Sequence, residues 1–165
     1  MTALQLACPV QTRIVDFIER LGIAVEVGEV PDDSFLPGCT VRYGKIIFNP
    51  DKVYTGDLLH EAGHIAVSPP ETRWTQEAIE HNPAEEMATI AWSYAAALEM
   101  GLDPAILFHE QGYSGGGGYL VPAFESEPGN GPGVPLLAWY GMTAEPKHAA
   151  ARGIPAYPVM TRWFR

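Results

Sequence analysis

Two histidines and a glutamate stand close together at residues 60–64, which read His-Glu-Ala-Gly-His. Residues four apart lie on one face of an α-helix, so His60 and His64 can reach the same metal ion if this segment is helical. Neutral imidazole is a good zinc ligand, and Glu61 would lie beside the metal without binding it, free to take a proton from water. The spacing therefore predicts a zinc site with Glu61 as its general base.

A catalytic zinc site also needs a third protein ligand and an open position for water. The extended form of this pattern would have glycine at position 67 and histidine at position 70, but the chain has Val67 and Pro70. The third ligand must therefore come from elsewhere. It is either a carboxylate on a following helix or a distant histidine such as His81 or His109.

The periodicity of apolar residues predicts the elements that position these side chains. We expect the motif helix over residues 55–67 and a second long helix over residues 83–101, which proline opens and glycine closes. The pattern also predicts further helices and strands. The helices are residues 9–21, 72–80 and 103–110, and the strands are residues 23–30, 40–43 and 45–48.

These elements predict an α+β fold in which a small antiparallel sheet packs on several helices, including the motif helix. Gly44 between the second and third strands indicates a tight hairpin. From about residue 112 the chain is rich in glycine and proline, and only a short apolar segment near residues 136–140 is indicated. A length of 165 residues fits one domain, so we expect residues 1–165 to fold together.

Composition narrows the range of functions. The net charge is −10, with 20 acidic and 10 basic residues, and this disfavours nucleic-acid binding. Cys8 and Cys39 are too few for a disulfide scaffold and fit no zinc-thiolate pattern, so we expect two idle thiols. The N-terminus has no secretory leader, and the apolar stretch over residues 87–102 is too short to span a bilayer. We therefore expect a soluble, cytoplasmic protein.

The helix over residues 83–101 resembles the second helix of the glutamate-ligand zincins. In these zinc peptidases a glutamate ligand is followed by a small residue three positions on and a polar residue four positions on. Glu85 fits this spacing with Ala88 and Thr89, whereas Glu86 would place Thr89 and Ile90 there. The resemblance implies metal ligands His60, His64 and Glu85, with Glu86 as the substitute, and gives Thr89 the role of steadying a histidine.

The order of elements also resembles the ImmA/IrrE-type metallopeptidases, over about residues 25–98. The segments that carry this resemblance are VRYGKIIFNPDKVYTGDLLHEAGHIAV and EEMATIAWSYAAAL. It implies a compact zincin-like fold, bound Zn²⁺ and hydrolysis of a peptide or protein substrate. Two alternatives stay open: a non-enzymatic zincin-fold regulatory or interaction protein that keeps the metal site, and a hydrolase of some other amide. The intact Glu61 favours an enzyme, because structural zinc needs no general base.

For a peptidase, we expect the substrate to bind by strand addition, with residues 45–48 as the candidate edge strand. An additional donor to the oxyanion often comes from a tyrosine or a histidine outside the motif. The sequence offers Tyr113, Tyr119, His109 and His148 and does not choose among them.

Overall fold

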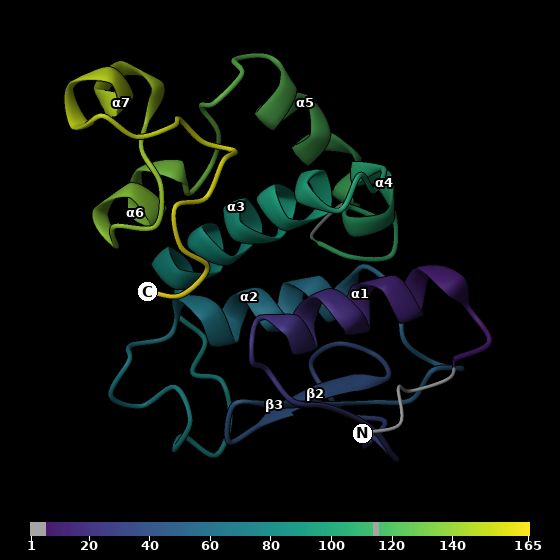
Figure 1. The fold of residues 1–165 in the computed structure, drawn as a ribbon. Coiled ribbons are helices and arrows are strands. Elements are labelled where there is room, and N and C mark those ends of the chain that lie inside the picture. Colours follow the sequence, from purple (N-terminus) through teal and green to yellow (C-terminus); the bar gives the residue numbers. More distant parts are fainter. Residues whose placement is uncertain (1–5, 114–115) are drawn as a thin grey trace.

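A three-stranded sheet forms one end of the molecule (Figure 1). The computed structural model of the chain describes residues 6–113 and 116–165. Strand β2 (Cys39–Arg42) pairs antiparallel with β3 (Lys45–Phe48), as the hairpin pattern predicted. Strand β1 (Val25–Val27) pairs parallel with β3, giving the strand order β1-β3-β2. The α+β class is confirmed, but the sheet is mixed rather than purely antiparallel.

The strand order corrects one expectation about the edge of the sheet. Lys45–Phe48 is the central strand, because β1 occupies the side of β3 that β2 leaves free. The outer strands are β1 and β2. Any added peptide strand must therefore pair with one of these two, and not with residues 45–48.

Two helices cover one face of this sheet, and a third lies across them (Figure 1). Helix α1 (Pro9–Arg20) packs on α2 (Asp57–Val67), and α2 contacts both β2 and β3. On its other side α2 packs along α3 (Pro83–Glu99), its most extensive helix contact. Because sheet, α1 and α3 surround it, every residue of α2 is buried. The motif helix is therefore the centre of the core.

The end of α2 explains why residues 72–80 do not form the helix that the pattern predicted: residues 72–75 form turns and residues 76–80 have no regular structure. The last carbonyl groups of a helix have no partner within it. The buried Arg73 guanidinium satisfies several of them, donating to the carbonyl oxygens of Ile65 at 3.1 Å and Ser68 at 3.1 Å. A regular helix over 72–80 is replaced by turns that leave Arg73 facing this end of α2.

The glycine- and proline-rich part folds into short helices on the far side of α3 from the sheet (Figure 1). Their aromatic side chains stack against Tyr94 of α3, with Phe124 at a centroid distance of 4.5 Å. Proline opens several of them, and α6 covers most of the apolar segment predicted near residues 136–140. These elements are the 3₁₀ turn η1 (Gly117–Tyr119), α5 (Leu120–Glu125), α6 (Val134–Trp139) and α7 (Pro146–Arg152). Helix α4 (Pro104–Leu107) precedes them, covers part of the helix predicted over residues 103–110 and contacts both α2 and α3.

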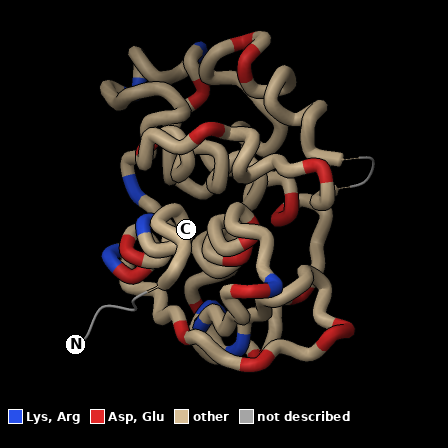
Figure 2. The backbone as a smooth tube through the Cα atoms, turned by 90° about the vertical axis from the view of Figure 1, so that its right-hand side faces the viewer, with Lys and Arg blue, Asp and Glu red and all other residues tan. Residues whose placement is uncertain are grey.

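The last residues return to the helix pair α2–α3. The indole of Trp92 donates to the carbonyl of Trp163 at 2.9 Å, and the amide of Arg165 donates to the carbonyl of Ala66 at 3.0 Å. Acidic positions are spread over the chain from the sheet to the C-terminal helices (Figure 2). Within the described part of the chain, no helix combines the length and apolar character needed to cross a bilayer.

Candidate metal site

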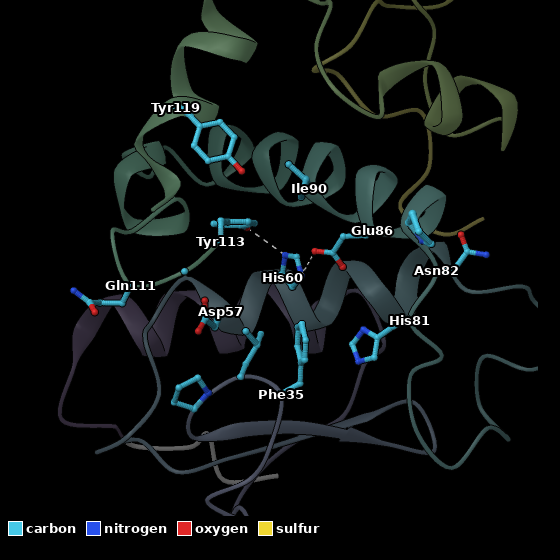
Figure 3. Close-up of a pocket in the computed structure, with 14 residues that line it drawn as sticks. Phe35, Asp57, His60, His81, Asn82, Glu86, Ile90, Gln111, Tyr113 and Tyr119 are labelled. Carbon is cyan, nitrogen blue, oxygen red and sulfur yellow. Dashed lines mark hydrogen bonds and ion pairs between the residues drawn. The ribbon is translucent and has the colours of Figure 1, made fainter. Parts of the chain in front are cut away.

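Three side chains from α2 and α3, those of His60, His64 and Glu86, converge on one point. Figure 3 shows two of them, His60 and Glu86, facing each other. The Nε2 atoms of His60 and His64 lie 3.1 Å apart. One carboxylate oxygen of Glu86 lies 3.1 Å from Nε2 of His60, and the other lies 3.0 Å from Nε2 of His64. The structure thus contains two buried histidines and a half-buried glutamate whose ligand atoms are close enough to share a metal ion.

The spacing of these atoms fits a tetrahedral ion. Zinc binds histidine nitrogen and carboxylate oxygen at about 2.0–2.2 Å, which puts neighbouring ligand atoms about 3.3 Å apart around a tetrahedron. The observed separations of 3.0–3.1 Å between His60, His64 and Glu86 are close to that value. Among the described residues, no lysine or arginine pairs with Glu86 in place of a metal.

Both histidines are also held at their second ring nitrogen. The Thr89 hydroxyl donates to the carbonyl of Glu85 at 2.8 Å, so towards Nδ1 of His64, 3.3 Å away, it can only accept. His64 therefore carries its proton on Nδ1 and presents the lone pair of Nε2 to the cluster. The Tyr113 hydroxyl lies 3.3 Å from Nδ1 of His60 and can accept in the same way. Thr89 thus contacts a histidine as the family resemblance implied, but it follows Glu86 by three positions and not by the four that the resemblance gives.

Glu86, and not Glu85, is the carboxylate that reaches the histidines. Successive residues of a helix point about 100° apart, so only one of two neighbouring glutamates can face α2. Glu85 points towards the C-terminal segment, where its carboxylate pairs with the Arg165 guanidinium at 3.3 Å. The expected ligand set of His60, His64 and Glu85 is therefore replaced by His60, His64 and Glu86.

Gly63 lets the two helices approach closely enough for Glu86 to reach. A Cβ atom at Gly63 would lie 3.0 Å from Cγ2 of Thr89, 3.2 Å from the Thr89 carbonyl oxygen and 3.2 Å from the Trp92 ring. These distances are shorter than ordinary contacts, and one of the neighbours is backbone that belongs to α3. The glycine between the two histidines is thus explained by packing against α3.

Charges in the cluster shift the acidities of its members. Burial alone would raise the pKa of Glu86, but its hydrogen bonds to His60 and His64 outweigh burial and hold the pKa well below the ordinary value. Burial lowers the pKa of His64, and the net shift is downward. For His60, burial also lowers the pKa, but the hydrogen bond and charge of Glu86 outweigh it and the pKa is raised. Metal binding requires an ionised Glu86 and two neutral histidines, so a metal ion must displace the proton that Glu86 favours on His60.

Glu61 lies beside this cluster without joining it. Its side chain is buried with 8% exposure, and burial raises its pKa to about 7 from an ordinary 4.5. A carboxylate that titrates near neutral pH can both accept and release a proton there. This is the acidity that a general base in a hydrolase needs.

The other histidines named from the sequence occupy different places. His81 lies near the cluster, with its ring 6.1 Å from that of His64, but it is not among the three converging ligands. His109 is bonded to Asp57 at 2.7 Å, and His148 lies on α7 beside Glu145. Tyr119 lines the cavity over the cluster (Figure 3).

The His109–Asp57 pair was not found from the sequence. Asp57 begins α2 and His109 follows α4, and burial raises the pKa of Asp57. The pair ties the segment that carries Tyr113 to the start of α2. No sequence signal joins two residues 52 positions apart, although an acidic residue in the first turn of a helix is itself a favourable pattern.

Two cavities open beside the cluster. The larger, of about 630 Å³, is lined by His60 and Glu86, and the smaller, of about 280 Å³, by Glu61 and strand β2. Both include Phe35, Leu36 and His81 in their walls, so they adjoin. The candidate ligands thus face one cavity and the candidate base faces the other.

Comparisons with protein-family models, with curated proteins and with solved structures gave no match to this chain. The resemblance to the ImmA/IrrE-type metallopeptidases therefore stays a prediction from sequence patterns. The structure supports a narrower statement: a His60, His64 and Glu86 group that could bind a metal lies in the core of an α+β fold.

Proposed function

We propose that the protein is a zinc-dependent peptidase in which His60, His64 and Glu86 hold the ion and Glu61 is the general base. The observation that carries this proposal is the convergence of three metal-binding side chains: the two Nε2 atoms lie 3.1 Å apart, and each lies 3.0–3.1 Å from a different oxygen of Glu86. Two imidazoles and one carboxylate form the ligand set of catalytic zinc sites, which leave one position open. Zinc bound there would acidify water and polarise a carbonyl group.

Glu61 supplies the proton transfers that such a reaction needs. Its buried carboxylate would accept a proton from the attacking water and return it to the leaving nitrogen. Burial keeps bulk water from competing for that proton. A purely structural metal site would have no use for a titratable carboxylate at this position.

The neighbouring strand β2 offers a place for a peptide backbone. Ile46 donates its amide to Ala24 at 3.0 Å, away from β2, and Ile46 is the register partner of Val41. The backbone groups of Val41 must therefore point away from β3, to the outer edge of β2. Val41 and Glu61 line the same cavity, so a peptide paired with Val41 lies beside the base.

This free edge is short. The amides on either side of Val41 in the outer row are already bonded, Cys39 to Leu36 and Tyr43 to Gln76. A substrate is therefore held by few backbone hydrogen bonds and needs side-chain contacts as well. His81 lines both cavities and is placed to donate to the oxygen on which negative charge develops.

The test combines metal analysis with peptide cleavage. Glu61→Gln should keep one zinc per chain and lose about 10²- to 10⁴-fold in hydrolysis of an unfolded protein substrate, followed by mass spectrometry. Glu99→Gln, at the exposed end of α3, is the matched control and should cleave as wild type does.

Two results would count against the peptidase. Wild type that binds stoichiometric zinc but cleaves no peptide would favour a non-enzymatic protein that keeps its metal. Cleavage that survives in Glu61→Gln would remove Glu61 from the mechanism.

A further inference from the structure

The larger cavity has a chemical character that the metal cluster does not explain. It is open to solvent on one side, and His60 and Glu86 form part of its floor (Figure 3). Its walls are mainly apolar and come from three distant parts of the chain. They are Phe35 and Leu36 before β2, Ile90 on α3, and Tyr113 and Tyr119 after α4.

The two aromatic residues at its mouth are unusually exposed. Phe35 is 72% exposed and Tyr119 is 56% exposed, although both line this cavity. Exposed aromatic side chains that flank an apolar hollow are typical of a surface that a ligand covers. Their positions on opposite sides of the cluster in Figure 3 leave the hollow between them.

Charge within the cavity argues against an ionic occupant. No lysine or arginine is among the described residues that line it, so nothing there attracts an acidic group. Its carboxylates are those of Glu86, which faces the two histidines, and Asp57, which is bonded to His109. The second oxygen of Asp57 has no hydrogen-bond partner among the described residues but is itself buried, so it is poorly placed to receive a basic group.

We propose that this cavity binds one large apolar or aromatic side chain of the substrate, next to the bond that is cleaved. The inference rests on the proposed peptidase function and adds the class of substrate. A peptide paired with Val41 in the smaller cavity passes His81 and the cluster, and its adjoining side chain then reaches the larger cavity. The apolar walls bind it in place of the backbone hydrogen bonds that the short edge of β2 cannot supply.

Ile90 sets the depth of this pocket. It follows Glu86 by one helical turn, so it lies on the same face of α3, directly behind the ligand. The cavity of about 630 Å³ has room for a phenylalanine or leucine side chain without any movement of Ile90. A larger residue at position 90 should therefore exclude large side chains and leave small ones.

The experiment uses two probes with the zinc-loaded full chain. The first is a degenerate peptide mixture, with cleavage sites mapped by mass spectrometry. The second is a pair of metal-anchored ligands, phenylalanine hydroxamate and glycine hydroxamate, whose binding needs the metal but no hydrolysis. We expect large apolar residues on one side of the cleaved bond and roughly ten- to hundredfold tighter binding of the phenylalanine compound.

Variants at two positions test the walls of the cavity. Tyr119→Ala should weaken phenylalanine hydroxamate roughly fivefold to tenfold with no effect on the glycine compound, because it removes one wall only. Ile90→Phe should reverse the preference towards small side chains. Trp139→Ala is the control, because Trp139 is 85% exposed and does not line the cavity. Zinc content, measured in each variant, reports whether the site has kept its geometry.

The two proposals fail in different ways. If wild type prefers phenylalanine hydroxamate, Ile90→Phe does not, and no peptide is cleaved, the pocket is supported and the peptidase function is overturned. Peptides cleaved without any apolar preference, or with a preference for lysine or arginine, overturn the pocket and leave the peptidase standing. Equal binding of both hydroxamates also overturns the pocket.

Discussion

Two groups on the same helix bring histidine to carboxylate, and they differ in how their atoms are matched. In the His109–Asp57 pair, one ring nitrogen meets one carboxylate oxygen at 2.7 Å, a short charge-assisted hydrogen bond. In the cluster, two Nε2 atoms and both oxygens of Glu86 face one another at 3.0–3.1 Å. The pair joins one atom of each side chain, whereas the cluster brings four nitrogen and oxygen atoms of three side chains together.

The surroundings of the two groups reinforce this difference. In the cluster, Thr89 and Tyr113 occupy the outer nitrogens of His64 and His60, so the inner nitrogens are directed at a common point. In the pair, Nδ1 of His109 and the second oxygen of Asp57 are buried without any hydrogen-bond partner among the described residues. Closeness of histidine and carboxylate is therefore not enough to indicate a metal site. A candidate metal site is distinguished by several ligand atoms whose lone pairs are directed at one common point.

The largest expected effect separates the two neighbouring glutamates of α3. Glu86→Gln should weaken zinc binding roughly a thousandfold, beyond the ten- to hundredfold typical of residues that only support a ligand. Glu85→Gln is the matched control and should leave zinc affinity unchanged, because Glu85 faces Arg165. Competition with a chromophoric chelator measures both. Equal losses in the two variants would contradict the assignment of Glu86.

The second prediction concerns the His109–Asp57 pair. His109→Ala should lower the free energy of unfolding by about 3 kcal/mol, because it leaves the Asp57 carboxylate buried without its partner. Zinc stoichiometry at saturating metal should stay at one per chain. His148→Ala, at a side chain that is 59% exposed, is the control and should unfold as wild type does. Chemical denaturation with chelator present provides the measurement.

Glu61 should make the metal-free protein less stable as the pH rises. Its folded pKa is about 7 against an ordinary 4.5, so its contribution to stability is fully present below pH 4.5 and is lost through pH 7. The loss amounts to about 3 kcal/mol. Glu61→Gln should remove this pH dependence. The free energy of unfolding of the metal-free variant should therefore rise relative to that of wild type between pH 4.5 and pH 8. A constant difference between the two proteins over this range would show that Glu61 titrates normally.

The smallest expected effect tests the support of His64. Thr89→Val keeps the shape of the side chain and removes the hydroxyl that accepts from Nδ1, so zinc affinity should fall ten- to hundredfold. Thr143→Val removes another buried hydroxyl, which donates to the carbonyl of Val159, and serves as control. The control should lose stability without any change in zinc affinity. If the two variants bind zinc equally well, the cluster does not depend on Thr89.

Local patterns in the sequence were sufficient for the parts of the site that lie within one element. The four-residue spacing of His60 and His64 and the apolar character of their helix predicted two rings on one face, and the structure agrees. The second long helix was likewise predicted, because proline opens it and glycine closes it. Thr89 was named from its spacing after Glu85; it does lie beside His64, although the converging carboxylate is that of Glu86.

The choice between Glu85 and Glu86 could not be made from local pattern. It depends on how α3 is rotated against α2, and this is fixed by the contact at Gly63 and by Arg165, which lies 80 residues from Glu85. The parallel pairing of β1 was missed for a related reason, since alternation of apolar residues fits either strand direction. The turns at residues 72–75 depend on the tertiary role of Arg73.

The close contact at Gly63 links the spacing of two helices to the chemistry of the site. Since the histidines belong to α2 and Glu86 to α3, any substitution that separates these helices must also stretch the ligand set. Metal affinity would then report the distance between α2 and α3. It should fall on substitutions at Trp92 that separate the helices, as well as on substitutions of the ligands. Conversely, an ion bound by residues of both helices should stabilise their contact. It should therefore slow hydrogen exchange of the amides of α2 and α3 along the whole interface between them.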